Sequence, residues 1–112
     1  MKVRVALGHQ ANGNVKMKIH AEIKTPAASY LISESHGSGG GRKYGAFVML
    51  RIVRVAAGAD YQSVRSRGVE VLEGYEVDSR NTGARSGYGH TLNALIARLP
   101  KAVRADDARL AA

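Results

Sequence analysis

The sequence has no cysteine and no tryptophan, and among its 112 residues only two are proline and one is phenylalanine. A chain without cysteine forms no disulfide and binds neither zinc nor an iron–sulfur cluster through thiolates. No apolar run approaches the roughly 20 residues of a membrane-spanning helix, and the first residues lack the apolar core of a signal peptide. We therefore expect a single domain in the cytoplasm, without membrane contact.

Positive charge is what the sequence has in excess: 17 Lys and Arg stand against 9 Asp and Glu, a formal net charge of +8. Residues 1–59 hold nine basic and two acidic residues, a net charge of +7, whereas residues 60–112 hold eight and seven, a net charge of +1. Such an asymmetry indicates a polyanionic partner. The alternative is a surface that keeps the protein soluble, because like-charged molecules repel each other.

Two segments near the start of the chain alternate between polar and apolar residues, which predicts strands with one buried face. They are residues 2–7 and 15–24, and Asn12-Gly13 between them indicates a hairpin. A three-residue loop that ends at Gly13 keeps the apolar sides of the two strands together, because side-chain direction has a period of two. This loop would pair Val5 with Ile19.

Two basic segments of this half are candidate contacts for an anionic partner. Lys16 and Lys18 lie on the predicted solvent face of the hairpin, where they could follow phosphates or only prevent edge-to-edge aggregation. A glycine-rich segment runs from His36 to Arg42 and Lys43, and its backbone N–H groups could surround a phosphate. The segment lacks the Lys-Ser/Thr ending of a P-loop, so a mobile surface loop is the alternative.

The segment after the hairpin fits two structures. Thr25-Pro26 is typical of a helix start, and Gly37 would end a helix over residues 27–36. The serines of this segment are mediocre helix formers, which leaves a strand over residues 29–35 as the alternative. We favour the helix.

Two further strands are predicted in the middle of the chain. Residues 46–55 are the most apolar stretch and are rich in β-branched side chains, which indicates a strand near the centre of a sheet. Arg51 and Arg54 differ in parity, which indicates a bulge near Ile52. Residues 69–78 alternate again and should pair their acidic side chains with basic ones across the sheet. The apolar residues expected on one face of this strand are Val69, Val71, Tyr75 and Val77.

An amphipathic helix is predicted near the end of the chain, from about residue 86 to 99. Its apolar stripe consists of Tyr88, Leu92, Leu95, Ile96 and Leu99. Ser86 is a good N-cap and Pro100 should end the helix, which leaves residues 101–112 as a flexible or weakly helical tail. The loop before the helix contains Arg80 and Arg85, so these arginines and Ser86 form a candidate anion site at the helix N-terminus. Alternatively, the arginines pair with acidic residues of the preceding strand.

The order of strands, a Gly/Ser/Arg loop and an amphipathic helix over residues 44–99 loosely resembles the last third of double-stranded-RNA-binding domains. The resemblance implies a helix N-terminus that contacts phosphates across a groove. Here Gly87-Tyr88-Gly89-His90 stands where that family has lysines, and the hairpin at the start of the chain is foreign to it. The likeness is one of topology, and we do not assign the chain to the family.

Together these patterns predict an α+β domain over residues 1–100, with an antiparallel sheet of four to five strands, an N-terminal hairpin and the helix packed on one face.

The four histidines show no metal-ligand or nucleophile–base spacing, so we expect a binding protein without a cofactor rather than an enzyme. An enzyme acting on phosphodiesters through His36 ranks last. The expected partner is nucleic acid, a nucleoprotein complex or an acidic protein surface. The alternative is a phage- or plasmid-encoded inhibitor of a defence system, comparable to an anti-CRISPR protein, and a homodimer could cover any sheet surface that the helix leaves open.

Overall fold

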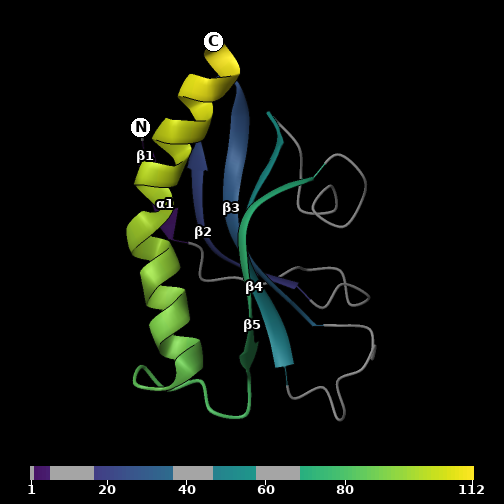
Figure 1. Ribbon diagram of the computed structural model, residues 1–112, viewed down its shortest axis with the longest axis vertical. Helices are drawn as coiled ribbons and strands as arrows, with labels where there is room; N and C mark the ends of the chain where they lie inside the picture. Colours follow the sequence, from purple (N-terminus) through teal and green to yellow (C-terminus); the bar gives the residue numbers. More distant parts are fainter. Residues whose placement is uncertain (1, 6–16, 37–46, 58–68) are drawn as a thin grey trace.

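The computed structural model describes residues 2–5, 17–36, 47–57 and 69–112, with backbone only at residues 2–5, 17 and 36. It contains a five-stranded antiparallel sheet and one long helix, so the predicted α+β class is confirmed (Figure 1). The elements are β1 (Lys2–Val5), β2 (Met17–Lys24), β3 (Ala28–His36), β4 (Phe47–Ala56), β5 (Glu70–Asp78) and α1 (Gly87–Ala111). The strand order in the sheet is β1-β2-β3-β4-β5, so each strand pairs with the next strand along the chain.

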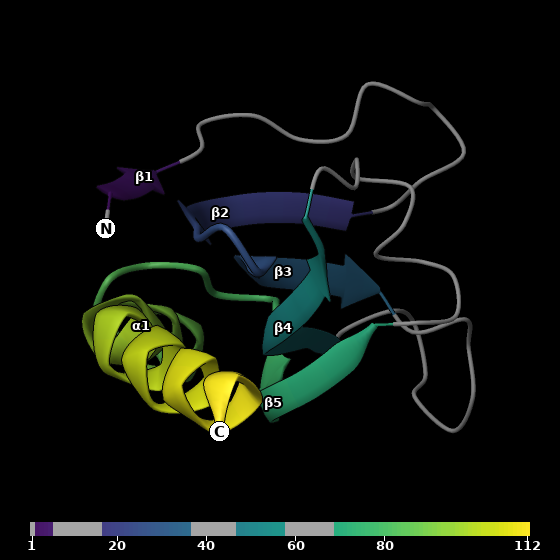
Figure 2. The same cartoon turned by 90° about the horizontal axis from the view of Figure 1, so that it is seen from above.

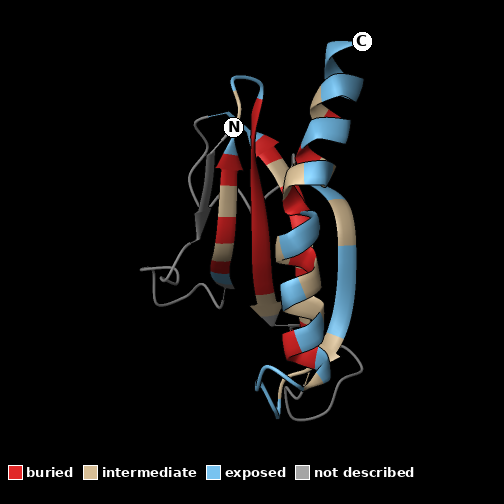
Figure 3. Cartoon of the chain, turned by 90° about the vertical axis from the view of Figure 1, so that its left-hand side faces the viewer, coloured by how far each residue is buried: buried red, intermediate tan, exposed pale blue. Residues whose placement is uncertain are grey.

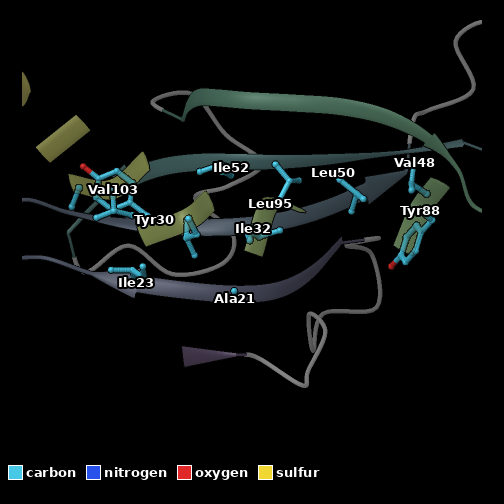
Figure 4. Packing of buried hydrophobic residues seen from close by; sticks show 12 residues of the cluster. Ala21, Ile23, Tyr30, Ile32, Val48, Leu50, Ile52, Tyr88, Leu95 and Val103 are labelled. Atoms are coloured by element: carbon cyan, nitrogen blue, oxygen red, sulfur yellow. The ribbon is translucent and has the colours of Figure 1, made fainter. Parts of the chain in front are cut away.

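The helix α1 lies along one face of the sheet, and the main core lies between them (Figure 2). Its predicted apolar stripe is confirmed: Tyr88, Leu95 and Leu99 are buried, and Leu92 and Ile96 pack against the core. The central strands are buried over much of their length (Figure 3), and their buried side chains meet this stripe (Figure 4). The strand contribution to the core is Ala21, Ile23, Ala28, Tyr30, Ile32, Val48, Leu50 and Ile52. Packing of this apolar area against the helix is the main force that joins the two layers.

The pairing of β1 with β2 confirms the predicted hairpin arrangement but corrects its register. Val5 lies opposite Ala21 rather than Ile19, and Lys2 lies opposite Lys24. The two registers differ by two residues. A shift by two leaves the alternation of the strands matched, so the apolar pattern cannot distinguish the two registers. The predicted loop itself lies outside the described residues.

Residues 28–36 form a central strand, so the favoured helix over this segment was wrong and the alternative strand is correct. β3 pairs with β2 on one side and with β4 on the other. The Thr25 hydroxyl oxygen accepts hydrogen bonds from the backbone N–H groups of Ala27 (3.3 Å) and Ala28 (3.2 Å), as an N-cap would. Here these bonds close the turn between two strands, because the chain continues into sheet pairing instead of a helix.

The predicted irregularity near Ile52 is present, but the extra residue belongs to the neighbouring strand. Ile52 pairs with Glu73 and Val53 pairs with Val71, so Leu72 of β5 has no partner in the register. Such a bulge changes the face to which the following residues point. Val71 therefore does not share a face with Tyr75 and Val77, which corrects the predicted single apolar face. Val77 and Leu72 pack against the core, whereas Val71 and Tyr75 are exposed.

The helix continues through Pro100 to Ala111, so the predicted end at Pro100 was wrong and residues 101–111 are helical. Val103 is fully buried in the core. Beyond it, the buried carboxylate of Asp106 accepts hydrogen bonds from the Tyr30 hydroxyl (2.8 Å) and the Arg54 guanidinium (2.7 Å). These contacts from β3 and β4 hold the last turns of α1 on the sheet and offset the hydrogen bond that proline removes.

One further bond completes this attachment: the Thr25 hydroxyl donates to Asp107 (3.1 Å). Within the helix, Arg109 also donates to Asp106 (2.7 Å). Burial would raise the pKa of Asp106, but the bonds from Arg54, Arg109 and Tyr30 outweigh it and lower that pKa. The ionised carboxylate of Asp106 is thus the form that the fold stabilises.

Candidate nucleic-acid interface

Four strands and the helix come together at one end of the sheet. Because neighbouring strands are antiparallel, the start of β2, the end of β3, the start of β4 and the end of β5 lie side by side there. The register shows this directly, because Met17 pairs with Ser35, His36 with Val48, and Phe47 with Asp78. The loop after β5 then leads into α1 at the same end (Figure 1, bottom). We call it the helix-start end.

All five described residues that the sequence marked as anion contacts lie at this end. Lys18 is the second residue of β2, His36 is the last of β3, and the remaining three belong to the loop between β5 and α1. Those three are Arg80, Arg85 and Ser86. The structure therefore brings together predicted site residues from three separate segments. The other candidates, Lys16, Arg42 and Lys43, lie outside the described residues.

Arg80 is committed to an internal ion pair rather than free for a ligand. Its guanidinium contacts both oxygens of Asp78, and its backbone N–H donates to the same carboxylate (2.8 Å). The side-chain and backbone hydrogen bonds from Arg80 lower the pKa of Asp78 to about 2. This pairing is the alternative that the sequence left open, and it holds for Arg80. Arg85, in contrast, is exposed.

Ser86 is the N-cap of α1, as predicted. Its hydroxyl oxygen accepts a hydrogen bond from the backbone N–H of Gly89 (3.1 Å) and its hydroxyl group donates to the carbonyl of Gly83 (2.7 Å). An open pocket of about 390 Å³ lies beside it, lined by Asp78, Arg80, Asn81, Ser86 and Gly87. Ser86 and Arg80 line this pocket, but their polar groups already have partners within the protein. They therefore offer few free hydrogen-bond donors to a ligand.

The loop approaches the helix so closely that residue 89 must be glycine. A Cβ atom at Gly89 would lie 2.3 Å from the carbonyl oxygen of Gly83 and 2.7 Å from backbone atoms of Ala84. Such distances are far below van der Waals contact. The missing side chain therefore lets residues 83–86 fold over the first turn of α1, which fixes the position of Arg85.

A buried carboxylate, which sequence reasoning did not mark, lies behind the helix-start end. Glu34 is only 4% exposed. Its Oε1 atom accepts hydrogen bonds from the His20 ring (Nε2, 2.8 Å) and from the hydroxyl of Tyr88. The three residues come from β3, β2 and α1. Nothing in the alternation of residues 17–24 indicates this contact, because it depends on a bulge at His20 in the pairing of β2 with β3.

The environment keeps Glu34 ionised. Burial would raise its pKa, but the hydrogen bonds from His20 and Tyr88, together with the charge of Lys18, lower it. The pKa of Tyr88 is raised by burial and by its bond to Glu34. Tyr88 therefore stays a hydrogen-bond donor, and it ties the first turn of α1 to the centre of the sheet.

Acidic and basic residues differ in how they are used over the described part of the chain. Each of its eight acidic residues interacts with another residue, mostly through hydrogen bonds or ion pairs. Among the same residues, five exposed cations have no hydrogen bond or ion pair. They are Lys18, Lys24, Arg85, Lys101 and Arg104. Within the described residues, excess positive charge is thus carried by side chains that are available to a partner.

No family model, curated protein or solved structure matches this chain. Among the described residues, three or more His, Asp or Glu side chains nowhere gather into a group that could hold a metal ion. In the same part of the chain, α1 is too polar to cross a membrane.

Proposed function

We propose that this protein binds nucleic acid and that the helix-start end contacts its phosphates. The proposal rests mainly on one observation: predicted anion contacts from separate segments converge at one end of the sheet. Phosphate contacts by Lys and Arg supply most of the affinity of proteins that bind nucleic acid without reading its sequence. The proposed activity is binding, and no residue is assigned a catalytic role.

The roles of the site residues differ. Lys18 and Arg85 are exposed and form no hydrogen bond or ion pair among the described residues, although the charge of Lys18 acts on Glu34, so they are the proposed direct contacts. Ser86 and Gly89 position Arg85 by folding the loop over the helix. The N-terminus of α1 adds a positive partial charge at the same end, because the peptide dipoles of the helix are aligned. Glu34 does not oppose an incoming anion strongly, since its charge is shared with His20, Tyr88 and Lys18.

The test is a fluorescence anisotropy titration with a labelled 20-base-pair DNA duplex and with single-stranded DNA, at several salt concentrations. A phosphate contact contributes about tenfold to the affinity at 0.1 M salt, because each one makes the slope of log K against log salt steeper by about 0.9. The double variant Lys18→Gln/Arg85→Gln should therefore bind roughly 100-fold more weakly than the wild type.

Lys24→Glu is the matched control, because it changes the net charge by the same two units. Lys24 is an exposed residue at the opposite end of β2 and has no partner among the described residues. If the control weakens binding as much as the double variant, net charge acts and the helix-start end is not the interface. If the wild type binds no nucleic acid at low salt, the proposed function itself is wrong, and an acidic protein surface becomes the partner to test.

A further inference from the structure

The outer surface of α1 is basic in its C-terminal half. Four cations lie on this helix, and all four are exposed: Arg98, Lys101, Arg104 and Arg109. At 3.6 residues per turn, they cover an arc of about 140° around the helix axis. The buried residues of α1 lie on the other side of the helix, against the sheet.

The acidic residues of α1 lie on its sheet side, where Asp106 also pairs with Arg109 (2.7 Å). The helix has only two, and Asp106 is buried against Tyr30 and Arg54. Asp107 is half-buried and accepts a hydrogen bond from Thr25 in the turn between β2 and β3. Both carboxylates are thus used to attach the helix to the sheet. Arg98 forms an ion pair with Glu73 of β5 (3.0 Å), so the outward side of the helix keeps uncompensated positive charge at Lys101 and Arg104.

The residues between the cations are small. Ala97, Ala105 and Ala108 are exposed on the same side, so a partner can approach the helix backbone closely. α1 contains one aromatic residue, Tyr88, and it is buried. Proteins that hold single strands combine cations with exposed aromatic side chains on which bases stack. The outer face of α1 itself thus offers cations without an aromatic platform. The exposed Tyr75 of β5 already has the Arg98 guanidinium over its ring, 5.9 Å from the centroid, so Lys101 and Arg104 suit phosphates on the outside of a double helix.

We propose that the outer face of α1 is a second contact surface for a nucleic-acid duplex, which it holds by its phosphates without reading bases. This inference rests on the proposed function and extends it, because the helix begins at the helix-start end and leads away from it. From Gly87, the first residue of α1, to Arg104 the helical rise amounts to about 26 Å. That distance corresponds to about eight base pairs of a duplex, at 3.4 Å per base pair.

The experiment compares Lys101→Glu and Arg104→Glu with Lys24→Glu, all measured by anisotropy on the 20-base-pair DNA duplex, on an RNA duplex and on single-stranded DNA. Each variant changes the net charge by two units, and circular dichroism checks that the helix is retained. Lys24 follows Ile23, whose side chain packs in the core, so alternation turns Lys24 away from α1. It therefore reports the effect of net charge alone.

We expect each α1 variant to weaken binding to duplexes at least tenfold, with a shallower salt dependence, and Lys24→Glu to weaken it less than threefold. The inference is wrong if the α1 variants and Lys24→Glu weaken duplex binding equally, or if the wild type prefers the single strand. In either case the Lys18→Gln/Arg85→Gln variant can still weaken binding, and the proposed function stands. If the wild type binds none of the three probes, both proposals fail.

Discussion

Gly89 is the residue whose replacement should disturb the candidate interface most directly. A methyl group there would overlap the backbone of residues 83 and 84. We expect Gly89→Ala to lower the free energy of unfolding by about 1–3 kcal/mol, the usual cost of forcing extra atoms into a packed site. Urea denaturation measures the change.

Gly87→Ala is the control, because a Cβ atom at Gly87 meets nothing within 4 Å. Alanine is a better helix former than glycine, so this variant should be neutral or stabilise the protein by up to about 1 kcal/mol. Equal losses in the two variants would show that the close approach at Gly89 has no special importance.

Glu34 should make the stability of the protein sensitive to acid. Its folded-state pKa lies below its ordinary value of 4.5. Such a group contributes stability above its unfolded-state pKa, and the contribution is lost as the pH falls through the folded-state pKa. The stability difference between the wild type and Glu34→Gln should therefore shrink when the pH is lowered from about 6 to about 2. Chemical denaturation at several pH values measures it.

Acid should destabilise the wild type through Asp106 as well, because the pKa of Asp106 is also lowered in the fold. The comparison with Glu34→Gln isolates the contribution of Glu34. Glu70→Gln, which removes an exposed carboxyl group, serves as control. A stability difference for Glu34→Gln that stays constant over the acid range would mean that Glu34 is not held ionised by His20 and Tyr88.

At the scale of the elements, the last turns of α1 should depend on a single carboxylate. Asp106→Asn leaves Arg54, whose side chain is 19% exposed, with only the longer ion pair to Glu70 (3.9 Å), and it weakens the bonds to Tyr30 and Arg109. Removing one partner of a largely buried ion pair costs about 3–5 kcal/mol, and we expect the lower part of this range. Thermal unfolding and the helical signal in circular dichroism measure the loss.

Asp107→Asn provides the comparison on the neighbouring residue. Asp107 accepts one described hydrogen bond, from Thr25 at 3.1 Å. Its replacement should cost about 1 kcal/mol or less. Similar effects of the two variants would contradict the attachment through Asp106.

The element boundaries show what local sequence patterns can and cannot predict. The alternation of β2, β4 and β5 and the stripe of α1 predicted each of these elements, because their buried faces repeat with the period of the structure. Thr25-Pro26 and Pro100 led to wrong helix boundaries for the same reason. Both are local signals, whereas long-range contacts determined the structure of these segments. Pairing on both sides of β3 and the bonds of Asp106 are invisible in a window of neighbouring residues.

At the scale of the whole molecule, protection from hydrogen exchange should follow the order of the sheet. β3 is hydrogen-bonded to β2 on one side and β4 on the other, so its amides should exchange only on global unfolding. β5 pairs, among the described strands, only with β4, and most of its residues are exposed or half-buried. We expect its amides to exchange faster through local opening, which exchange followed by mass spectrometry resolves. Slower exchange in β5 than in β3 would contradict this.

The sequence could predict which residues belong to the candidate interface, but not that they lie together at one end of the sheet. The sequence indicated Lys18 and Arg85 because their side chains are cationic, and Ser86 because it is an N-cap at a helix N-terminus, where anions bind. Their convergence requires the antiparallel order of all strands, which no single segment contains. The carboxylate of Glu34 and the outward face of α1 beyond Pro100 were missed. Glu34 depends on a bulge in β2, and the helix depends on contacts made by residues 103–107.

The order of elements along the chain has a consequence for synthesis. Because every strand pairs with its predecessor, the sheet can grow in the order in which the ribosome makes it. Its apolar face remains open to water until α1, the last of the described elements, has been added. At 5–20 residues per second, the 25 residues of α1 take about 1–5 s to make. During that interval the apolar face of the nascent sheet is vulnerable to aggregation. Once α1 has packed on the sheet, its buried Asp106 carboxylate holds the helix there.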